Sequence, residues 1–530
     1  MRTPCDEALA RSKKGDVVLR AGCERWILAA TILASSMAFI DGTVVNVALP
    51  ALQANFHATV TGAQWVVESY GMFLSALILV GGAVGDSIGR RRVFLIGVAI
   101  FAVASAACGM APDIGTLIIA RSVQGFGAAL LVPGSLSIIS ASFDEKSRGQ
   151  AIGTWSGFTA ITTAIGPVIG GWLIQHASWR WAFFVNIPVA IAVMVISLWR
   201  VPESRSSRLE RIDWLGAVVG TLGLGGLVIG LIEAVELGWR SPLVIASLGI
   251  GIVCLIAFIP IEQRQHSPMV PLELFRSKAF TAANVLTLFL YAALGAFFFL
   301  FPMNLIQVHG YSTTEAGAAA LPLILLMFVL SRWSGGLVVR VGPRLPLIMG
   351  PFIAAIGFAM FAMPTHGQYW KSYFPSFLVL GFGLSITVAP LTTVVMGSVD
   401  QDRSGTASGI NNAVARVAGV LAIAVLGIIM VHAFSKKLEK DLSRSALPQS
   451  VKAEIQSRSS RLAALEPPQQ LEETAKNYVH LVVQDSFTFG FRIVILICAA
   501  LAAISALVTL VIVPRDATAG LKTKASPQQG

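Results

Sequence analysis

The feature that most restricts the fold of this chain is a series of apolar stretches, each about 20 residues long, that recurs along nearly its whole length. A helix of about that length crosses the hydrocarbon core of a bilayer. With 55% hydrophobic and 13% charged residues and a mean hydropathy of +0.74, the composition is unlike that of a soluble domain of this size. The sequence therefore predicts an all-α polytopic membrane protein.

Charged or Gly/Pro-rich breaks divide the apolar stretches into fourteen predicted transmembrane helices. The first, from Trp26 to Pro50, is too long for a signal peptide and lacks a small-residue cleavage site, so we interpret it as a retained span. The predicted spans begin near Trp26, Trp65, Val93, Gly115, Arg148, Trp181, Trp214, Pro242, Ala279, Thr314, Pro346, Tyr373, Gly405 and Phe487.

The positions of the basic residues predict the orientation of these spans. If the basic amino terminus lies inside, the short outer loops carry only Arg180, Arg240 and Lys371. The short inner loops carry Arg90, Arg91, Arg92, Lys146, Arg148, Arg200, Arg205, Arg208, Arg211, Arg264, Arg276, Lys278, Arg340, Arg344 and Arg403. This asymmetry follows the positive-inside rule, predicts both termini in the cytoplasm, and explains the net charge of +11 without nucleic acid.

The segment from Ser435 to Asp485 is polar and carries charges of both signs. An even number of spans places it outside, where long loops weigh little in the positive-inside rule. We expect amphipathic helix or coil lying on the surface.

Two loose repeats indicate duplicated halves, as in many secondary transporters. The first pairs Gly82…Arg91 with Gly335…Arg344, and the second pairs Gly149-x-Ala151-x-Gly153 with Gly405-x-Ala407-x-Gly409. The predicted organisation is a cytoplasmic tail at 1–25, a six-helix half at 26–200, a linker with two inserted helices at 201–278, a six-helix half at 279–514 that includes an external loop at 435–485, and a cytoplasmic tail at 515–530.

Five motifs lie on or between the first six spans. They are Ile40-Asp41-Gly42-Thr43-Val44-Val45-Asn46-Val47-Ala48-Leu49-Pro50 at the end of the first span, Gly82-Ala83-Val84-Gly85-Asp86-Ser87-Ile88-Gly89-Arg90-Arg91-Arg92 after the second, Arg121-Ser122-Val123-Gln124-Gly125-Phe126-Gly127 in the fourth, Gly157…Gly166-Pro167-Val168-Ile169-Gly170-Gly171 in the fifth, and Trp179-Arg180-Trp181-x-Phe183-x-x-Asn186-x-Pro188 at the sixth. Asp213-Trp214-x-Gly216 opens the seventh span.

These motifs resemble the major facilitator superfamily, and within it the fourteen-span drug:proton antiporter branch, the QacA- and EmrB-like exporters. The resemblance covers most of the chain. It implies two six-helix halves plus two inserted helices, a location in a bacterial inner membrane, alternating access, and proton-coupled efflux of small amphiphilic organic compounds or drugs. The fifth-span motif resembles the antiporter motif, which favours export over uptake.

The resemblance also assigns roles to two sets of residues. Gly82, Asp86, Gly89, Arg90 and Arg91 match a cytoplasmic gate, in which the Asp86 carboxylate faces the positive end of a helix in the other half; the alternative is plain loop charges. Gly157, Gly166, Pro167, Gly170 and Gly171 match the antiporter motif, and the small residues let helices approach closely and bend.

Asp41 and Glu68 stand out because an ionisable side chain at bilayer depth costs on the order of 3 kcal/mol. A carboxylate that couples proton movement must gain and lose its proton near neutral pH, which requires a pKa roughly three units above the reference value. We expect Glu68 and Asp41 to exchange protons with the outside. They should then lose these protons when substrate binds from the inside. For Asp41 a hydrogen-bonded packing role is an equal alternative.

Arg121 should point into the protein because it is costly in lipid. The resemblance implies proton transfer or cavity electrostatics, and the alternative is a buried ion pair with Asp41 or Glu68. These three residues form the predicted proton-coupling site.

Other polar and aromatic residues leave the substrate open. Helix thirteen carries Asn411, Asn412 and Arg416 in place of the further acids of some cation exporters, which leaves monocations, neutral compounds and anions open. The aromatic residues of helix nine are candidates for a drug cavity or for packing: Phe289, Tyr291, Phe297, Phe298 and Phe299.

Scattered cysteines and lone histidines give no metal-ligand spacing, and no Walker loop or metalloprotease motif occurs, so we expect no metal, no cofactor and no enzyme activity.

The expected partners are a small-molecule substrate, protons and the lipid bilayer, with no nucleic acid and a monomeric state. The sequence leaves open whether a periplasmic adaptor docks.

Two other transport functions stay open: a dedicated exporter of one endogenous metabolite or lipid, and a proton-coupled uptake symporter on the same fold. A membrane-bound enzyme or a sensor is disfavoured because no catalytic constellation is present.

Overall fold

The computed structural model describes residues 23–143, 145–205, 213–363, 368–399 and 404–512. Within these ranges the regular structure is entirely helical, with no strand. Nearly all of the predicted tails at 1–25 and 515–530 therefore lies outside the described residues, as do Arg208, Arg211 and Arg403.

The helices follow one another with short connections. Those of the first part of the chain are α2 (Cys23–Phe56), α3 (Val60–Ile88), α4 (Arg90–Met110), α5 (Ile114–Ser142), α6 (Glu145–His176), α7 (Trp181–Phe184), α8 (Asn186–Arg200), α9 (Trp214–Leu237) and α10 (Pro242–Arg264). Those of the second part are η1 (Leu272–Arg276), α11 (Lys278–Met303), η2 (Asn304–Val308), α12 (Thr313–Ala318), α13 (Leu321–Gly335), α14 (Leu337–Val341), α15 (Arg344–Phe361), η3 (Tyr369–Tyr373), α16 (Phe374–Gly397), α17 (Ser404–Ser443), α18 (Gln449–Ser457), η5 (Ser459–Ala464) and α19 (Glu473–Ile512).

Fourteen helical segments among the described residues are long and apolar enough to cross a bilayer. They correspond one to one with the predicted spans, and most begin within a few residues of the predicted starts. The prediction of an all-α protein with fourteen spans is therefore confirmed. Long apolar stretches reveal the number and positions of the spans because each span must offer lipid an apolar surface along its whole length.

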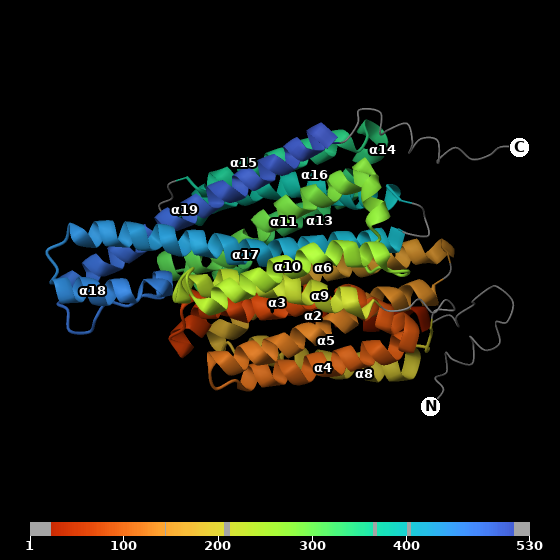
Figure 1. The fold of residues 1–530 in the computed structure, drawn as a ribbon, viewed down its shortest axis with the longest axis horizontal. Coiled ribbons are helices and arrows are strands. Elements are labelled where there is room, and N and C mark those ends of the chain that lie inside the picture. The colour runs from red at the N-terminus through yellow and green to blue at the C-terminus, as the bar shows by residue number, and fades with distance from the viewer. Residues whose placement is uncertain (1–22, 144, 206–212, 364–367, 400–403, 513–530) are drawn as a thin grey trace, which may run out of the picture.

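Two bundles make up most of the molecule (Figure 1). In the N-terminal bundle, α2 packs against α5, α6 and α8, while α5 also packs against α3 and α4. In the C-terminal bundle, α11 packs against α17 and α19, while α15 and α16 pack on each other. The two bundles meet where α3 packs on α17 and where α6 packs on α12.

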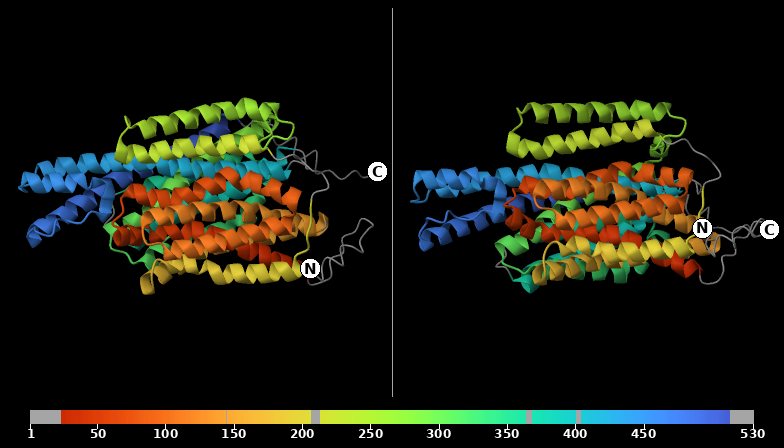
Figure 2. Two further views of the ribbon diagram at one scale, coloured as in Figure 1. Left: turned by 60° about the horizontal axis from the view of Figure 1, so that its bottom comes forward. Right: turned by 90° about the horizontal axis from the view of Figure 1, so that it is seen from below.

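Helices α9 and α10 form a pair at the side of the molecule (Figure 2). Helix α9 contacts both α3 and α17, so it covers the line where the two bundles meet. Its Leu224, Val228 and Ile232 form a buried cluster with Met72 of α3 and Val420 of α17.

The segment 435–485 differs from the prediction in one respect, because the membrane helices continue into it. Helix α17 extends to Ser443, and α19 begins at Glu473, well before the predicted start at Phe487. Hydropathy marks only the part of a helix in lipid, whereas a helix satisfies its own backbone hydrogen bonds in any surroundings. We call the projecting part from Ser435 to Asp485 the hairpin.

The apolar core of the bundles continues into the hairpin. Its fully or almost fully buried side chains include Leu438, Leu442, Ile455, Leu462 and Val479. Figure 1 shows α18 at one end of the molecule, opposite the start of α2 and the end of α19. We call these the hairpin end and the terminal end.

Candidate functional site

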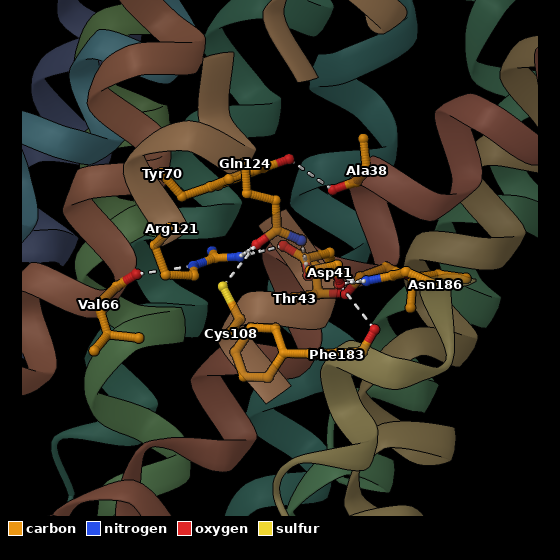
Figure 3. A network of polar contacts seen from close by, with 12 residues as sticks. Ala38, Asp41, Thr43, Val66, Tyr70, Cys108, Arg121, Gln124, Phe183 and Asn186 are labelled. Atoms are coloured by element: carbon orange, nitrogen blue, oxygen red, sulfur yellow. Dashed lines mark hydrogen bonds and ion pairs between the residues drawn. The ribbon is translucent and has the colours of Figure 1, made fainter. Parts of the chain in front are cut away.

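A buried ion pair joins α2 to α5 in the middle of the N-terminal bundle (Figure 3). Arg121 Nη1 donates to Asp41 Oδ2, and the two residues are 1% and 0% exposed. The sequence brings these residues together because each lies on the face of its helix that packs inward, where an unpaired charge would be costly.

Neighbouring amides complete the hydrogen bonding of this pair. Gln124 Nε2 and Asn186 Nδ2 donate to Asp41 Oδ1 at 2.8 and 3.1 Å, so both carboxylate oxygens have donors. Arg121 Nε donates to the carbonyl oxygen of Val66 at 3.1 Å, and its Nη1 also donates to Gln124 Oε1 at 2.8 Å. The network therefore ties together α2, α3, α5 and α8.

Aromatic rings cover the guanidinium of Arg121. Its central carbon lies 4.2 Å from the ring centroid of Tyr70 and 5.8 Å from that of Phe183. The Tyr70 hydroxyl donates to the carbonyl oxygen of Ala38 at 3.0 Å. Cation–π contacts of this kind stabilise a cation that has been removed from water.

The structure thus confirms one of the alternatives for Arg121, an ion pair with Asp41. Sequence reasoning did not assign Tyr70, Gln124 or Asn186 to the site, although the last two stand in the quoted motifs. Their polar side chains inside apolar spans are the signal that identifies them.

Glu68 lies apart from this network. It is 0% exposed, and neither of its carboxyl oxygens accepts a hydrogen bond from a described residue. It lies between Gln64 and Gly71 on α3, at the four- and three-residue spacings that share one helix face.

That face of α3 packs on α17, across the boundary between the bundles; we call this contact the seam. Gln64 Nε2 donates to the carbonyl oxygen of Ile423 at 2.9 Å. A Cβ built on Gly71 would lie 3.1 Å from Val420 Cγ2. Glu68 therefore lies in the seam, on the same face as two residues that contact the other bundle.

The outer surface of the seam is covered by α9. Trp65 Nε1 of α3 donates to Glu233 Oε1 at 2.7 Å, and Thr59 Oγ1 donates to Glu236 Oε1 at 2.5 Å. Hydrogen bonds from α3 and from its N-cap residue therefore hold both glutamates at the end of α9.

The predicted antiporter motif forms the second contact between the bundles. A Cβ on Gly171 would lie 2.3 Å from the carbonyl oxygen of Thr313, and a Cβ on Gly317 would lie 2.0 Å from that of Pro167. Thr313 Oγ1 also donates to the carbonyl oxygen of Gly171 at 2.8 Å. Small residues at these positions are what allow α6 and α12 to close on each other.

The other glycines of this motif act within the N-terminal bundle. A Cβ on Gly166 would lie 2.8 Å from Thr43 Oγ1, and one on Gly170 would lie 2.3 Å from Val44 Cγ1. Gly157 differs, because a Cβ there would meet nothing within 4 Å. Close packing explains Gly166 and Gly170 but not Gly157.

The predicted gate residues lie at the terminal end, where their described contacts are within the N-terminal bundle. Arg90 Nε pairs with Asp86 Oδ1 at 2.7 Å, and Arg91 Nη1 donates to the carbonyl oxygen of Val201 at 2.9 Å. Gly89 has a φ of +132°, a conformation that favours glycine. Gly82 packs near Pro133, 3.6 Å from a built Cβ.

At the hairpin end, η5 lies over the meeting point of the bundles, in contact with α2, α3 and η2. Gln307 Nε2 donates to Gln53 Oε1 at 2.9 Å across this boundary. Beneath η5 is a cavity of about 390 Å³ whose lining includes Gln53, His57, Gln307, Arg461 and His480.

The aromatic residues of α11 pack mainly inside the C-terminal bundle. Phe297 and Phe299 are 0% and 1% exposed, and Phe297 contacts Phe301, Phe358 and Phe377. For Phe297 and Phe299 this favours the packing interpretation. No group of three or more His, Cys, Asp or Glu residues that could hold a metal occurs within the described ranges.

Residues 31–423 match the profile of the family described as Major Facilitator Superfamily. The multidrug resistance protein Stp of Mycobacterium tuberculosis is 35% identical over 435 residues, covering 81% of this chain and 80% of Stp. The tetracenomycin C resistance and export protein of Streptomyces glaucescens is 32% identical, covering 91% of this chain and 90% of that protein.

A solved structure has the same fold. A bacterial homologue of the human lysosomal transporter Spinster superposes with a TM-score of 0.65 at 17% identity, covering 96% of this chain and 99% of that one. At this identity the likeness concerns the fold alone.

The network predicts different stabilities for two conservative variants. Asp41→Asn keeps the side-chain size but leaves the buried Arg121 without a negative partner, which costs about 3–5 kcal/mol. Glu68→Gln removes no hydrogen bond between described residues and should change the free energy of unfolding by less than about 1 kcal/mol. Thermal denaturation in detergent should show a large fall in midpoint for Asp41→Asn only; equal midpoints would contradict the ion-pair assignment.

Proposed function

The chain belongs to the Major Facilitator Superfamily, and we propose that it exports small amphiphilic organic compounds, drugs among them, from a bacterial cell in exchange for protons. Its relatives carry names of resistance and export proteins, which supports efflux. The family transports solutes and is not a family of enzymes.

The observation that carries proton coupling is the isolation of Glu68 in the seam. An ionised carboxylate that is fully buried without a partner would cost several kcal/mol, so this arrangement favours the neutral acid. When the bundles separate along α3 and α17, water reaches the same carboxyl group. Its proton occupancy is then linked to the position of the bundles.

Alternating access follows from the two contacts between the bundles. The hydrogen bonds that join the bundles at these contacts, from Gln64 to Ile423 and from Thr313 to Gly171, lie in the halves of α3 and α6 nearer the hairpin end, so we infer that this arrangement is closed there. In the proposed cycle the hairpin end opens, Glu68 takes a proton from outside, the bundles close again, and substrate from the cytoplasm displaces the proton.

Asp41 and Arg121 contribute the second part of the coupling. Because the pair joins four helices of the N-terminal bundle, a proton on Asp41 would release Arg121 and loosen their packing. We assign to Asp86 and Arg90 the closing of the terminal end, where Asp86 would exchange its present partner for a helix amino terminus of the C-terminal bundle.

We place the terminal end in the cytoplasm and the hairpin outside. The connections at the terminal end are rich in arginine and lysine, whereas the short connections at the hairpin end carry Arg180, Arg240 and Lys371. We further propose that the bundles correspond to the halves at 26–200 and 279–514, and that a monomer carries out transport.

Substrate uptake into energised inverted vesicles tests this function, because the lumen of such a vesicle corresponds to the outside of the cell. With a fluorescent amphiphilic substrate, wild-type transport should stop on addition of a protonophore. Glu68→Gln should reduce the proton-dependent rate at least about tenfold, because an amide cannot gain and lose a proton near neutral pH.

Glu236→Gln is the matched control, since its amide oxygen can still accept from Thr59 and it lies outside the seam. It should keep the wild-type rate. Protonophore-resistant transport, or full activity of Glu68→Gln, would contradict proton coupling through this residue.

The orientation predicts opposite labelling of two single-cysteine variants made after replacement of the native cysteines. Ser450→Cys in the exposed part of the hairpin should react with a membrane-impermeant maleimide in intact cells. Arg205→Cys, exposed at the terminal end, should react only after the cells are permeabilised. The reverse pattern would place the termini outside.

A further inference from the structure

Arg416 places a positive charge inside a membrane span, with no ion-pair partner among the described residues. It lies in α17, within the candidate span Thr406–Ser443, and is only partly buried. Among the described residues it has neither an ion pair nor a hydrogen bond; its described side-chain contact is with the ring of Phe39, 5.5 Å from the guanidinium carbon. A charge at this depth normally has a partner or a function.

The contact with Phe39 shows which way the side chain points. Phe39 belongs to α2 of the N-terminal bundle, so Arg416 faces the other bundle and not lipid.

Arg416 is part of a polar stripe along α17. Ser408, Asn412 and Arg416 follow one another at four-residue spacing, so they share one helix face, and all three are exposed or partly exposed. Asn411, one position away, instead packs inside its bundle, where its Nδ2 donates to Thr287 Oγ1 at 2.7 Å. Because Arg416 on this face contacts Phe39 of α2, we place the stripe on the side of α17 that faces the N-terminal bundle.

The other charges of this region do not balance Arg416. Asp41 and Arg121 cancel each other in the buried ion pair. Glu68 is buried without a hydrogen-bond partner in the seam, where the neutral acid is favoured. One positive charge is left over, and a guanidinium with free donors suits a carboxylate or another acidic oxygen.

We propose that Arg416 binds the acidic group of the transported compound, so that the substrates are amphiphilic organic anions. Phe39 supplies an apolar surface beside the charge, and the Asn412 amide lies one turn along the same stripe. This inference rests on the proposed export function and names its substrate class. An anion that leaves a cell with a negative interior also moves in the direction that the membrane potential favours.

Three probes with one pyrene body test the substrate class: 1-pyrenebutyrate, its uncharged amide, and the corresponding trimethylammonium cation. Fluorescence anisotropy on the purified full-length protein should give the carboxylate about tenfold higher affinity than the amide, and weaker binding of the cation. Arg416→Gln should remove the preference without weakening the amide, while Arg416→Lys should keep part of it. Arg205→Gln, at an exposed position, is the matched control.

Equal affinity of wild type for the carboxylate and the amide would overturn the inference. So would an unchanged preference in Arg416→Gln. Thermal denaturation of the variants, together with their retained affinity for the amide, separates loss of the anion site from loss of folding.

Transport of the same probes separates this inference from the proposed function. Protonophore-sensitive export of the amide or the cation in preference to the carboxylate would retain the export function and overturn the anion site. If none of the three probes is exported, the export function fails for these compounds and the binding preference decides the anion site alone.

Discussion

A charge inside an apolar helical bundle needs a partner, and much of this molecule is organised by how that requirement is met. Arg121 and Asp41 satisfy it for each other, with Gln124, Asn186 and a carbonyl oxygen completing the hydrogen bonds. Because these groups come from α2, α3, α5 and α8, the pair fixes four helices of the N-terminal bundle relative to one another. The bundle can then move as a unit.

Glu68 and Asp41 differ in whether other groups balance their buried carboxyl groups. Both carboxyl groups are fully buried, yet Asp41 has three donors and Glu68 has none among the described residues. A paired carboxylate stabilises one arrangement, whereas an unpaired acid between two bundles favours separation whenever it loses its proton. The glycines opposite Thr313 and Pro167 permit the tight closure that buries such a group.

Local sequence properties predict the spans and motifs well, because hydropathy and loop charge depend on neighbours along the chain. Contacts between residues that are distant in the sequence are harder to predict. The sequence allows either Asp41 or Glu68 as the partner of Arg121, and only the packing of the helices decides between them. The extension of α17 and α19 into the hairpin is likewise hidden, since hydropathy ends where lipid ends. The position of α9 over the seam depends on contacts with two distant helices.

The charge asymmetry between the two sides of the seam connects the coupling site to the substrate. Glu68 on α3 and Arg416 on α17 belong to different bundles, and neither has an ion-pair or hydrogen-bond partner among the residues that the structure describes. Opening and closing the seam therefore changes the surroundings of both groups together. Transport should depend on this movement more than on any single contact.

Locking the seam tests that claim most directly. Gly71→Cys and Val420→Cys, in a variant without other cysteines, place two thiols where a built Cβ lies 3.1 Å from the facing side chain. Oxidation should stop proton-dependent efflux, and reduction should restore it, while each single variant stays active under oxidation. Undiminished transport by the cross-linked protein would contradict the account.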